Sequence, residues 1–324
     1  MRHVAKVVLF LAASLCVLPA SGQKKGNFWN DLNQFLDMRA QKASARWDSN
    51  YVVRYPYRWD SRAFVSSPNL RFDSTFGDGI HLATAVVARV GVGISFRGLG
   101  VNFAPAIGKK HTFDLSLSGY GRHFGIEYNW RSGMGLNGAS DNNLLFITNR
   151  LNLLYSFNPR FSYAAALKQT RIQRRSAGSV LAAFNWSMWD LLYLNDDDVF
   201  GSYFKFNYFL QRFLLGVGYG YNLVVGQQHW LIHASVLPMW SVYEMQSWRQ
   251  GTEHERKNYP YGHIAFMGTA RASVSYRWET RWSLGLNGQI NEIGSMTHLS
   301  RQTPADPRFR SREWEVKLTL TFRF

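Results

Sequence analysis

The sequence predicts a transmembrane antiparallel β-barrel, all-β apart from one short N-terminal amphipathic helix. Apolar residues recur at every second position over most of the chain, and no apolar run beyond the N-terminus is long enough for a membrane helix. A barrel strand needs apolar side chains only on its lipid side. A chain with 46% hydrophobic and 16% aromatic residues can therefore keep a mean hydropathy of −0.24.

The first 22 residues have the features of an export signal. Basic residues precede an apolar core over 7–18, and Ala20-Ser21-Gly22 supplies the small side chains of a cleavage site. We expect residues 1–22 to be a cleaved signal peptide and the mature chain to reach the outer membrane of a Gram-negative bacterium. The only cysteine, Cys16, lies in this segment, so the mature chain has no thiol chemistry.

Residues 23–50 are expected to form a periplasmic helix and linker. Phe28, Leu32 and Phe35 have helical spacing, which indicates a short amphipathic helix within residues 28–47. The barrel itself is expected over residues 51–324.

Alternation is clearest at the C-terminus. Apolar side chains at 314, 316, 318, 320, 322 and 324 alternate with charged or polar ones at 313, 315, 317, 319, 321 and 323, so the two sets point to opposite sides of the strand. Phe322 and Phe324 resemble the terminal signal that the barrel-assembly machinery recognises. Similar patterns cover 86–96, 113–117, 124–130, 213–225, 230–240, 264–278 and 282–290, and weaker ones cover 58–67, 98–106, 143–157, 160–170 and 177–190.

Turn lengths set the expected topology. Tight links at Arg97-Gly98, Gly121-Arg122, Asn158-Pro159, Gly226-Gln227 and Glu279-Thr280 are expected on the periplasmic side, and long links near 132–142, 243–261 and 294–311 on the extracellular side. These links favour fourteen strands if residues 200–210 form a further strand. Twelve strands are the alternative.

Three stretches carry a family resemblance. They are Tyr51-Val52-Val53 with Tyr55-Pro56, the run from Phe161 to Ala166 that continues through Gln169 to Ser179, and Gly218-Tyr219-Gly220-Tyr221-Asn222. Together they resemble domain-of-unknown-function family 4421 of outer-membrane proteins. The resemblance implies a barrel and provides neither catalytic residues nor a substrate.

The charge is strongly positive, with 37 Lys and Arg against 21 Asp and Glu, or +16. In an exported chain such a charge favours outer-membrane lipid headgroups, lipopolysaccharide phosphates or a small anionic solute as partners, rather than nucleic acid.

The strand positions that alternate with the apolar ones should point into the lumen, and they carry more cationic than acidic side chains. The lumen-lining candidates are Arg89, Arg97, Asp114, Glu127, Arg131, Arg150, Lys168, Arg271 and Arg277, with Glu279, Glu313 and Glu315 as further acids. Either these charges pair and fill the lumen, or an excess of cations attracts anions. Glycines at 91, 93, 216, 218 and 220 are expected to leave part of the lumen open.

His233 and Ser235 form the one constellation with catalytic potential. Two positions apart on a strand they share a face, and barrel lipases use such a pair, with Glu244 as a possible orienting group. Parity directs both side chains to the lumen instead of lipid, so we do not expect an enzyme. Asp196-Asp197-Asp198 fits a solvated turn better than a calcium loop, and no metal or cofactor is expected.

The sequence thus supports three functions. A pore or binding barrel for a small polar or anionic solute is favoured. A structural barrel with a filled lumen, whose extracellular loops bind a protein partner, is the alternative. An acyl hydrolase that uses His233 and Ser235 is the least favoured.

Overall fold

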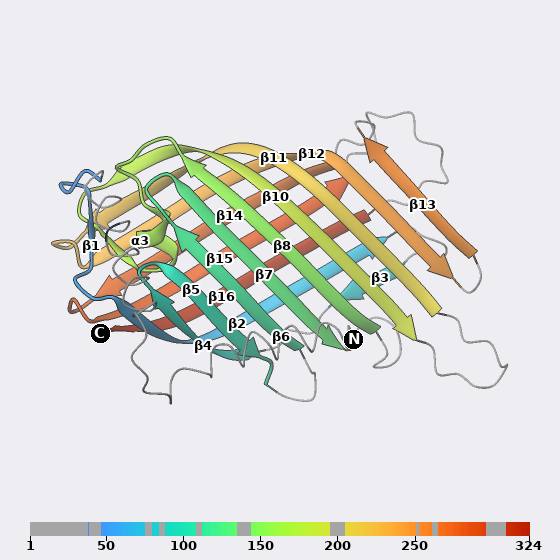
Figure 1. Cartoon of the computed structure of the whole chain (residues 1–324), viewed down its shortest axis with the longest axis horizontal. Coiled ribbons are helices and arrows are strands. Elements are labelled where there is room, and N and C mark those ends of the chain that lie inside the picture. Colours follow the sequence, from blue (N-terminus) through green and yellow to red (C-terminus); the bar gives the residue numbers. More distant parts are fainter. Residues whose placement is uncertain are drawn as a thin grey trace, which may run out of the picture. The chain divides into compact units, whose positions relative to one another are not determined.

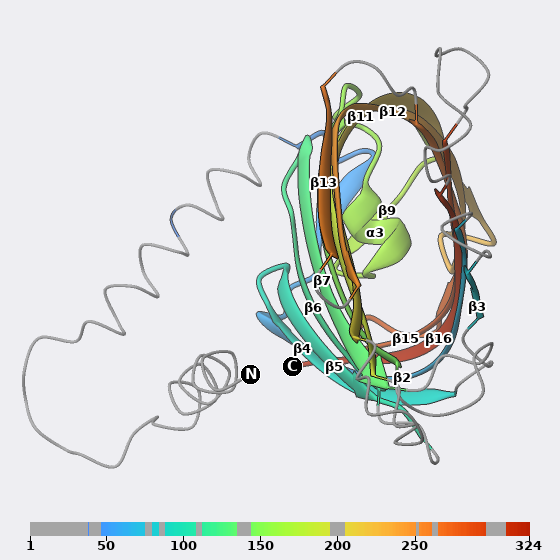
Figure 2. The ribbon, with the colours of Figure 1, turned by 90° about the vertical axis from the view of Figure 1, so that its right-hand side faces the viewer.

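A computed structural model describes residue 38 and residues 47–74, 80–83, 88–107, 112–134, 144–194, 205–250, 253–260, 265–295 and 309–324. Within these residues twelve antiparallel strands close into a barrel (Figures 1 and 2). The barrel strands are β2 (Trp59–Ser74), β4 (Arg89–Phe96), β5 (Leu99–Pro105), β6 (Thr112–Tyr120), β7 (Phe124–Met134), β8 (Leu144–Ser156), β10 (Ala177–Leu194), β11 (Lys205–Val225), β12 (Trp230–Gln250), β14 (Ala265–Arg277), β15 (Trp282–Ser295) and β16 (Phe309–Arg323).

The expected signal peptide lies outside the described residues, and so does the expected helix over 28–47 apart from Met38 and Trp47. No helix in the described part of the chain is long and apolar enough to cross a membrane.

The predicted number of fourteen strands is wrong for two reasons. Residues 205–225 form one continuous strand, β11, because a β-bulge beside Phe213 lets it stay paired with β12 along its length. Residues 160–170, expected as a strand, contain instead the short helix α3 (Tyr163–Leu167). The Ser162 side chain caps this helix by accepting a hydrogen bond from the amide of Ala165.

The outer surface of the barrel carries the apolar band that a membrane-spanning barrel needs. The outward positions are exposed and apolar on every side of the ring, for example Val92, Ile94, Phe103, Ile126, Val217, Val236, Val274, Leu286 and Val316. Such a surface is stable only in lipid, which confirms the transmembrane β-barrel fold and an outer-membrane location.

Aromatic rings form a belt at one end of this band. Trp230 packs on Tyr276, Trp278 stacks on Trp282, and Trp282 packs on Phe322, at centroid distances of 4.6, 6.3 and 4.6 Å. Across the ring Phe124 meets Tyr155 at 4.8 Å. Aromatic girdles of this kind mark a membrane–water interface, where the Trp and Tyr rings combine an apolar body with a polar group.

Short turns gather at the same end of the barrel. They join β4 to β5, β6 to β7, β11 to β12 and β14 to β15. Trp59 and Phe324 close the ring there through two backbone hydrogen bonds of 3.0 and 3.1 Å. Since short turns face the periplasm in such barrels, we take this as the periplasmic end.

At the opposite end β11 and β12 extend far beyond the membrane. Each has 21 residues, about twice what a bilayer needs. The outer part of β12 also pairs with β13 (Glu253–Pro260), and β3 (Ile80–Ala83) pairs with β2. The expected long link over 243–261 is therefore largely a β-hairpin.

Residues 157–176 form a plug that enters the barrel between β8 and β10 (Figure 2). The expected tight turn at Asn158-Pro159 is the start of this plug. It contains α3 and β9 (Arg171–Gln173), which pairs with β1 (Val52–Arg54). Ala164, Ala165 and Ala166 are at most 1% exposed, so the plug is tightly enclosed.

Hydrogen bonds from several strands hold the plug. Asn222 Nδ2 donates to the Ser162 carbonyl at 3.0 Å, and Ser273 Oγ to the Ala166 carbonyl at 2.9 Å. From β15 and β16, Ser283 Oγ donates to Gln169 Oε1, and Arg323 Nη2 to the Gln169 carbonyl, both at 2.6 Å.

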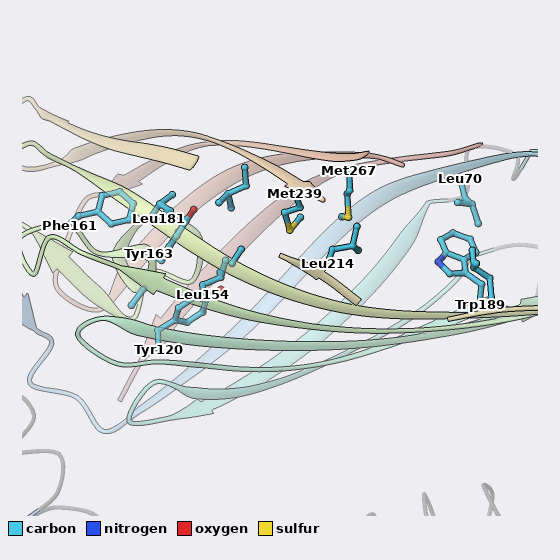
Figure 3. Close-up of a cluster of buried hydrophobic side chains, with 14 of the residues drawn as sticks. Leu70, Tyr120, Leu154, Phe161, Tyr163, Leu181, Trp189, Leu214, Met239 and Met267 are labelled. Carbon is cyan, nitrogen blue, oxygen red and sulfur yellow. The ribbon is translucent and has the colours of Figure 1, made fainter. Parts of the chain in front are cut away.

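One inner wall of the barrel carries a cluster of buried apolar side chains (Figure 3). We call it the packed wall. It comprises Trp189, Leu191, Leu210, Leu214, Leu237 and Met239 on β10 to β12, none more than 3% exposed. The same cluster includes Leu70, although β2 lies across the ring from β10. Apolar side chains from opposite sides of the ring, such as Leu70 and Trp189, therefore meet inside the lumen.

Candidate functional site

Between the plug and the packed wall lies a polar cavity of about 160 Å³. It is lined by β2, β5 to β8, β14 to β16 and the C-terminal end of α3; we call the strand surfaces facing it the cavity wall. Its charged lining consists of six cations and four carboxylates: Arg62, Arg131, Arg150, Lys168, Arg271 and Lys317, with Asp114, Glu127, Glu313 and Glu315. The lining therefore carries an excess of positive charge.

Most of these charges are paired in a network across the lumen. Arg131 bonds Asp114 through Nε at 2.7 Å and Glu313 through Nη1 at 2.5 Å. Arg150 Nη2 reaches the other oxygen of Glu313 at 2.5 Å, and Arg89 pairs with Asp114. The network links β4, β6, β7 and β8 to β16. Each buried carboxylate thus has two guanidinium partners, which offsets its desolvation.

A second pair joins β7 to β14. Arg271 donates to both oxygens of Glu127, at 3.2 and 2.7 Å, and the Tyr120 hydroxyl donates to the same carboxylate. This bidentate geometry is the strongest form of an Arg–carboxylate contact. It holds the cavity wall together beside the plug.

Lys168 and Lys317 differ from the other cations. In the described part of the chain neither ammonium group has a carboxylate within 4.0 Å, although both line the cavity. Lys317 Nζ lies 3.4 Å from the centroid of the Phe64 ring. Burial lowers the pKa of Lys168 below its ordinary value, although the charge of Glu127 acts in the opposite direction. The cavity therefore holds two ammonium groups without an anionic partner.

The structure places the predicted lumen-lining residues in three groups. Asp114, Glu127, Arg131, Arg150, Lys168 and Arg271 line the cavity, and Arg89 pairs with Asp114 beside it. The alternation predicts Lys168 on a strand, but the side chain enters the lumen from the plug. Arg97 and Arg277 lie at the periplasmic rim, where Arg97 forms a turn and Arg277 donates to the Gln228 carbonyl. The exposed Glu279 lies in the turn next to it.

Two cavity cations were missed from the sequence. Lys317 shares the inward parity of Glu313 and Glu315, so its position in the strand could have identified it. Arg62 lies in β2, whose alternation is too weak to show which side faces inward.

The expectation that glycines leave the lumen open is wrong. A Cβ added at Gly91 would overlap the Phe64 ring, and one at Gly216 would overlap Met239. Neighbouring side chains occupy the space that these glycines leave.

His233 lies in a buried hydrogen-bond chain next to the plug. Its Nε2 is 3.1 Å from Ser235 Oγ, and its Nδ1 is 2.8 Å from Asn222 Oδ1 on the neighbouring strand. Phe161 and Tyr163 of the plug pack against its ring at 5.9 and 5.4 Å. His233 and Ser235 are only 1% and 4% exposed, so substrate has no access to them in this conformation.

Glu244 does not orient His233, contrary to the possibility raised by the sequence. It pairs with Arg212 at 2.6 Å inside the packed wall. Among the described residues no group of three or more His, Cys, Asp or Glu side chains is placed to hold a metal ion. Asp196 to Asp198 lie outside those residues.

Comparisons with known proteins concern the family and the fold. The family model described as "Domain of unknown function (DUF4421)" matches residues 46–324. No curated protein matches the sequence. Among solved structures, the outer-membrane protease OmpT from Escherichia coli is similar at 8% identity and a TM-score of 0.40, with 84% of this chain and 98% of that chain covered.

Two further solved structures are similar at comparable distance. The toluene transporter TbuX from Ralstonia pickettii has 9% identity and a TM-score of 0.31, with 82% and 89% covered. A FadL homologue from Pseudomonas aeruginosa has 10% identity and a TM-score of 0.30, with 82% and 90% covered. Likenesses this distant assign no role to the chain.

Proposed function

We propose that this chain, which belongs to the DUF4421 family through residues 46–324, is an outer-membrane barrel that binds a small anionic solute inside its lumen. The observation that supports this function is the pair of ammonium groups, Lys168 and Lys317, that have no carboxylate partner among the described residues, in a cavity whose other cations are paired. Leaving two such charges without an anion is costly in a low-dielectric interior. A bound anion removes that cost.

The size of the cavity limits the solute. An apolar protein cavity of about 150 Å³ accommodates benzene, so about 160 Å³ suits a solute of roughly six non-hydrogen atoms. Inorganic phosphate, sulfate and short carboxylates fall in this range. The amides of Asn102, Asn287 and Gln289 supply further polar contacts in the lining.

Obstructions on both sides of the cavity favour binding over free passage. The plug occupies the lumen on the periplasmic side, and the apolar side chains of the packed wall project into it on the extracellular side. Passage through the barrel therefore requires the plug to move. We propose a binding barrel with a closed resting state, not an open porin-like pore.

Anion binding is tested with the refolded full barrel. Titration calorimetry with phosphate, sulfate and acetate should show saturable binding of at least one anion. Lys317→Gln should weaken it at least tenfold, because one of the two ammonium groups is lost. Arg310→Gln, which removes an exposed cation paired with Glu292, is the matched control and should bind like the parent chain. Equal affinities of the two variants, or no binding, would refute the proposal.

The closed state is tested by planar-bilayer conductance. The parent barrel should conduct rarely, and replacing residues 160–174 with a short Gly-Ser linker should raise the conductance several-fold with a preference for anions. Steady, large conductance of the parent barrel would show an open pore and refute the closed state alone, since the calorimetric result is independent of it.

The hydrogen-bond chain from Asn222 through His233 to Ser235 supports a second candidate, an acyl hydrolase. A histidine that contacts both a serine and an orienting amide matches the arrangement of a nucleophile with its general base. We give it second place because the plug covers both groups. Labelling of Ser235 by a fluorophosphonate, lost in Ser235→Ala, would favour it; no labelling even after plug replacement would exclude it.

A further inference from the structure

The periplasmic end of the barrel is strongly basic. Its described segments, 47–60, 97–98, 121–123, 157–176, 226–229, 277–281 and 323–324, contain only three acidic side chains, Asp48, Asp60 and Glu279. They contain eleven arginines: Arg54, Arg58, Arg97, Arg122, Arg160, Arg171, Arg174, Arg175, Arg277, Arg281 and Arg323. The single lysine of these segments, Lys168, lines the cavity instead. Most of the net charge of the mature chain is therefore concentrated at one end.

Part of this surface is held in a fixed arrangement around the small sheet of β1 and β9. Arg160 and Arg175 both stack on the Tyr51 ring, with guanidinium carbons 4.8 and 5.9 Å from its centroid. Arg171 stacks on Trp47 at 5.2 Å. Stacking orders the guanidinium planes while leaving their donors available, so less entropy is lost when they bind a carboxylate.

Three arginines of this group are exposed. The Arg160 side chain is 55% exposed despite its contact with Asp48 at 3.2 Å, and Arg174 and Arg175 are exposed beside the end of β9. Like charges held this close repel one another, which is unfavourable unless an anionic partner is present. We call Tyr51, Arg160, Arg174 and Arg175 the arginine face.

The geometry points to a docking site for an acidic, extended segment of a periplasmic partner protein on the arginine face. Arginine forks bind carboxylates in bidentate fashion, which suits Asp and Glu side chains. Three such forks on one exposed surface can contact several acidic side chains of the same segment at once.

An acidic protein fits this face better than anionic lipid. The arginine face belongs to the plug and to the chain that precedes β2, not to the strands that contact the bilayer. Lipid headgroups meet the perimeter, which the belt around Trp278 and Trp282 marks. Arg160, Arg174 and Arg175 thus lie where a protein reaches them and the headgroup ring does not.

The probe is a fluorescein-labelled peptide of alternating Glu and Thr, compared with its Gln and Thr counterpart. Fluorescence anisotropy with the folded barrel in detergent should show saturable binding of the Glu peptide only, weakened strongly when salt rises from about 0.05 to 0.5 M. Arg160→Gln, Arg174→Gln and Arg175→Gln combined should reduce affinity at least tenfold. The control combines Arg310→Gln with Arg312→Gln, two exposed arginines near the other end of the barrel, and should bind normally.

The outcomes separate the alternatives. Equal binding of both peptides, or equal loss in the triple variant and the control, would overturn the proposal. If the triple variant keeps peptide binding but loses adsorption to phosphatidylglycerol vesicles, the face is a lipid site and the protein proposal is wrong. Heat-modifiable gel mobility confirms that each variant is folded. Phosphate binding in the cavity should be unchanged in the triple variant, so this proposal can fail without affecting the proposed function.

Discussion

The two inner walls of the barrel differ in the side chains that they place in the lumen. The packed wall on β10 to β12 uses mainly buried Leu, Met and Trp side chains, and the strands that carry it also bury the ion pair Arg212–Glu244. The cavity wall uses Arg–carboxylate pairs that reach across the lumen and keep about 160 Å³ open. Both have the same alternation on their outer face.

The difference indicates that one wall contributes mainly to folding stability and the other mainly to ligand binding. Apolar packing stabilises the packed wall through buried area, and any unpaired charge there has no water to solvate it. The cavity wall gains less from burial, but its carboxylates Asp114 and Glu313 each have two arginine partners, and two ammonium groups are left for a ligand. We therefore expect variants of the packed wall to affect folding and variants of the cavity wall to affect binding.

The largest effect should come from Arg212→Met. It leaves the Glu244 carboxylate, which is 2% exposed, without its guanidinium partner, and breaking a buried pair costs about 3–5 kcal/mol. Urea unfolding of the barrel in lipid vesicles measures the loss. Adding Glu244→Leu should recover part of the stability, since the buried unpaired charge is then removed, although the Gln246 side chain loses its hydrogen bond to Glu244. A double variant as unstable as the single one would show that the pair is not the cause.

Leu214→Ala should cost somewhat less, about 3 kcal/mol, because it opens a void in the packed wall at a side chain that is 0% exposed. Leu167→Ala is the matched change on the cavity side, where the removed atoms already border open space. It should cost clearly less in the same unfolding experiment. Similar losses in both variants would mean that the plug residue beside the cavity is packed as tightly as the packed wall.

Arg150→Gln should be milder still, at about 2 kcal/mol. Glu313 keeps its contact with Arg131, so the carboxylate loses one charged hydrogen bond but is not left alone. The unfolding midpoint reports the change. If Arg150→Gln lowers the free energy of unfolding as much as Arg212→Met does, a second arginine partner does not protect a buried carboxylate.

Lys168→Gln should change stability least, within about 1 kcal/mol, and in a direction that depends on pH. Because burial lowers the pKa of Lys168, the unfolded chain binds this proton more tightly than the folded one, and stability rises as pH increases through the folded pKa. The variant should lose this part of the pH dependence and be the more stable one at lower pH. Parallel stability–pH curves for the two proteins would contradict this assignment.

The alternation of apolar residues predicted nearly every strand and the inward direction of Asp114, Glu127, Arg131, Arg150 and Arg271. It could not predict the plug, because Phe161, Tyr163 and Ala165 alternate as a strand would. Ser162 before an Ala-rich run was the signal for a helix, and only enclosure by the surrounding strands decides between the two.

Register was the other limit. The tight turn expected at Gly226-Gln227 has two residues. It would shift β12 by two positions relative to β11, and Asn222 would not lie opposite His233. The actual turn spans residues 226–229, with positive φ at Gln227 and Gln228, and pairs the two residues directly. The partner of a histidine across a hairpin therefore depends on turn geometry, which alternation does not encode.

The hydrogen bonds that hold the plug set an order of events during biogenesis. Gln169 receives its partners from Ser283, Thr321 and Arg323, so residues at the very end of the chain complete the seat of a segment made much earlier. The bonds from Thr321 and Arg323 to Gln169 can form only once β16 has joined the ring. Closure of the barrel at β16 and full fixation of the plug are therefore coupled.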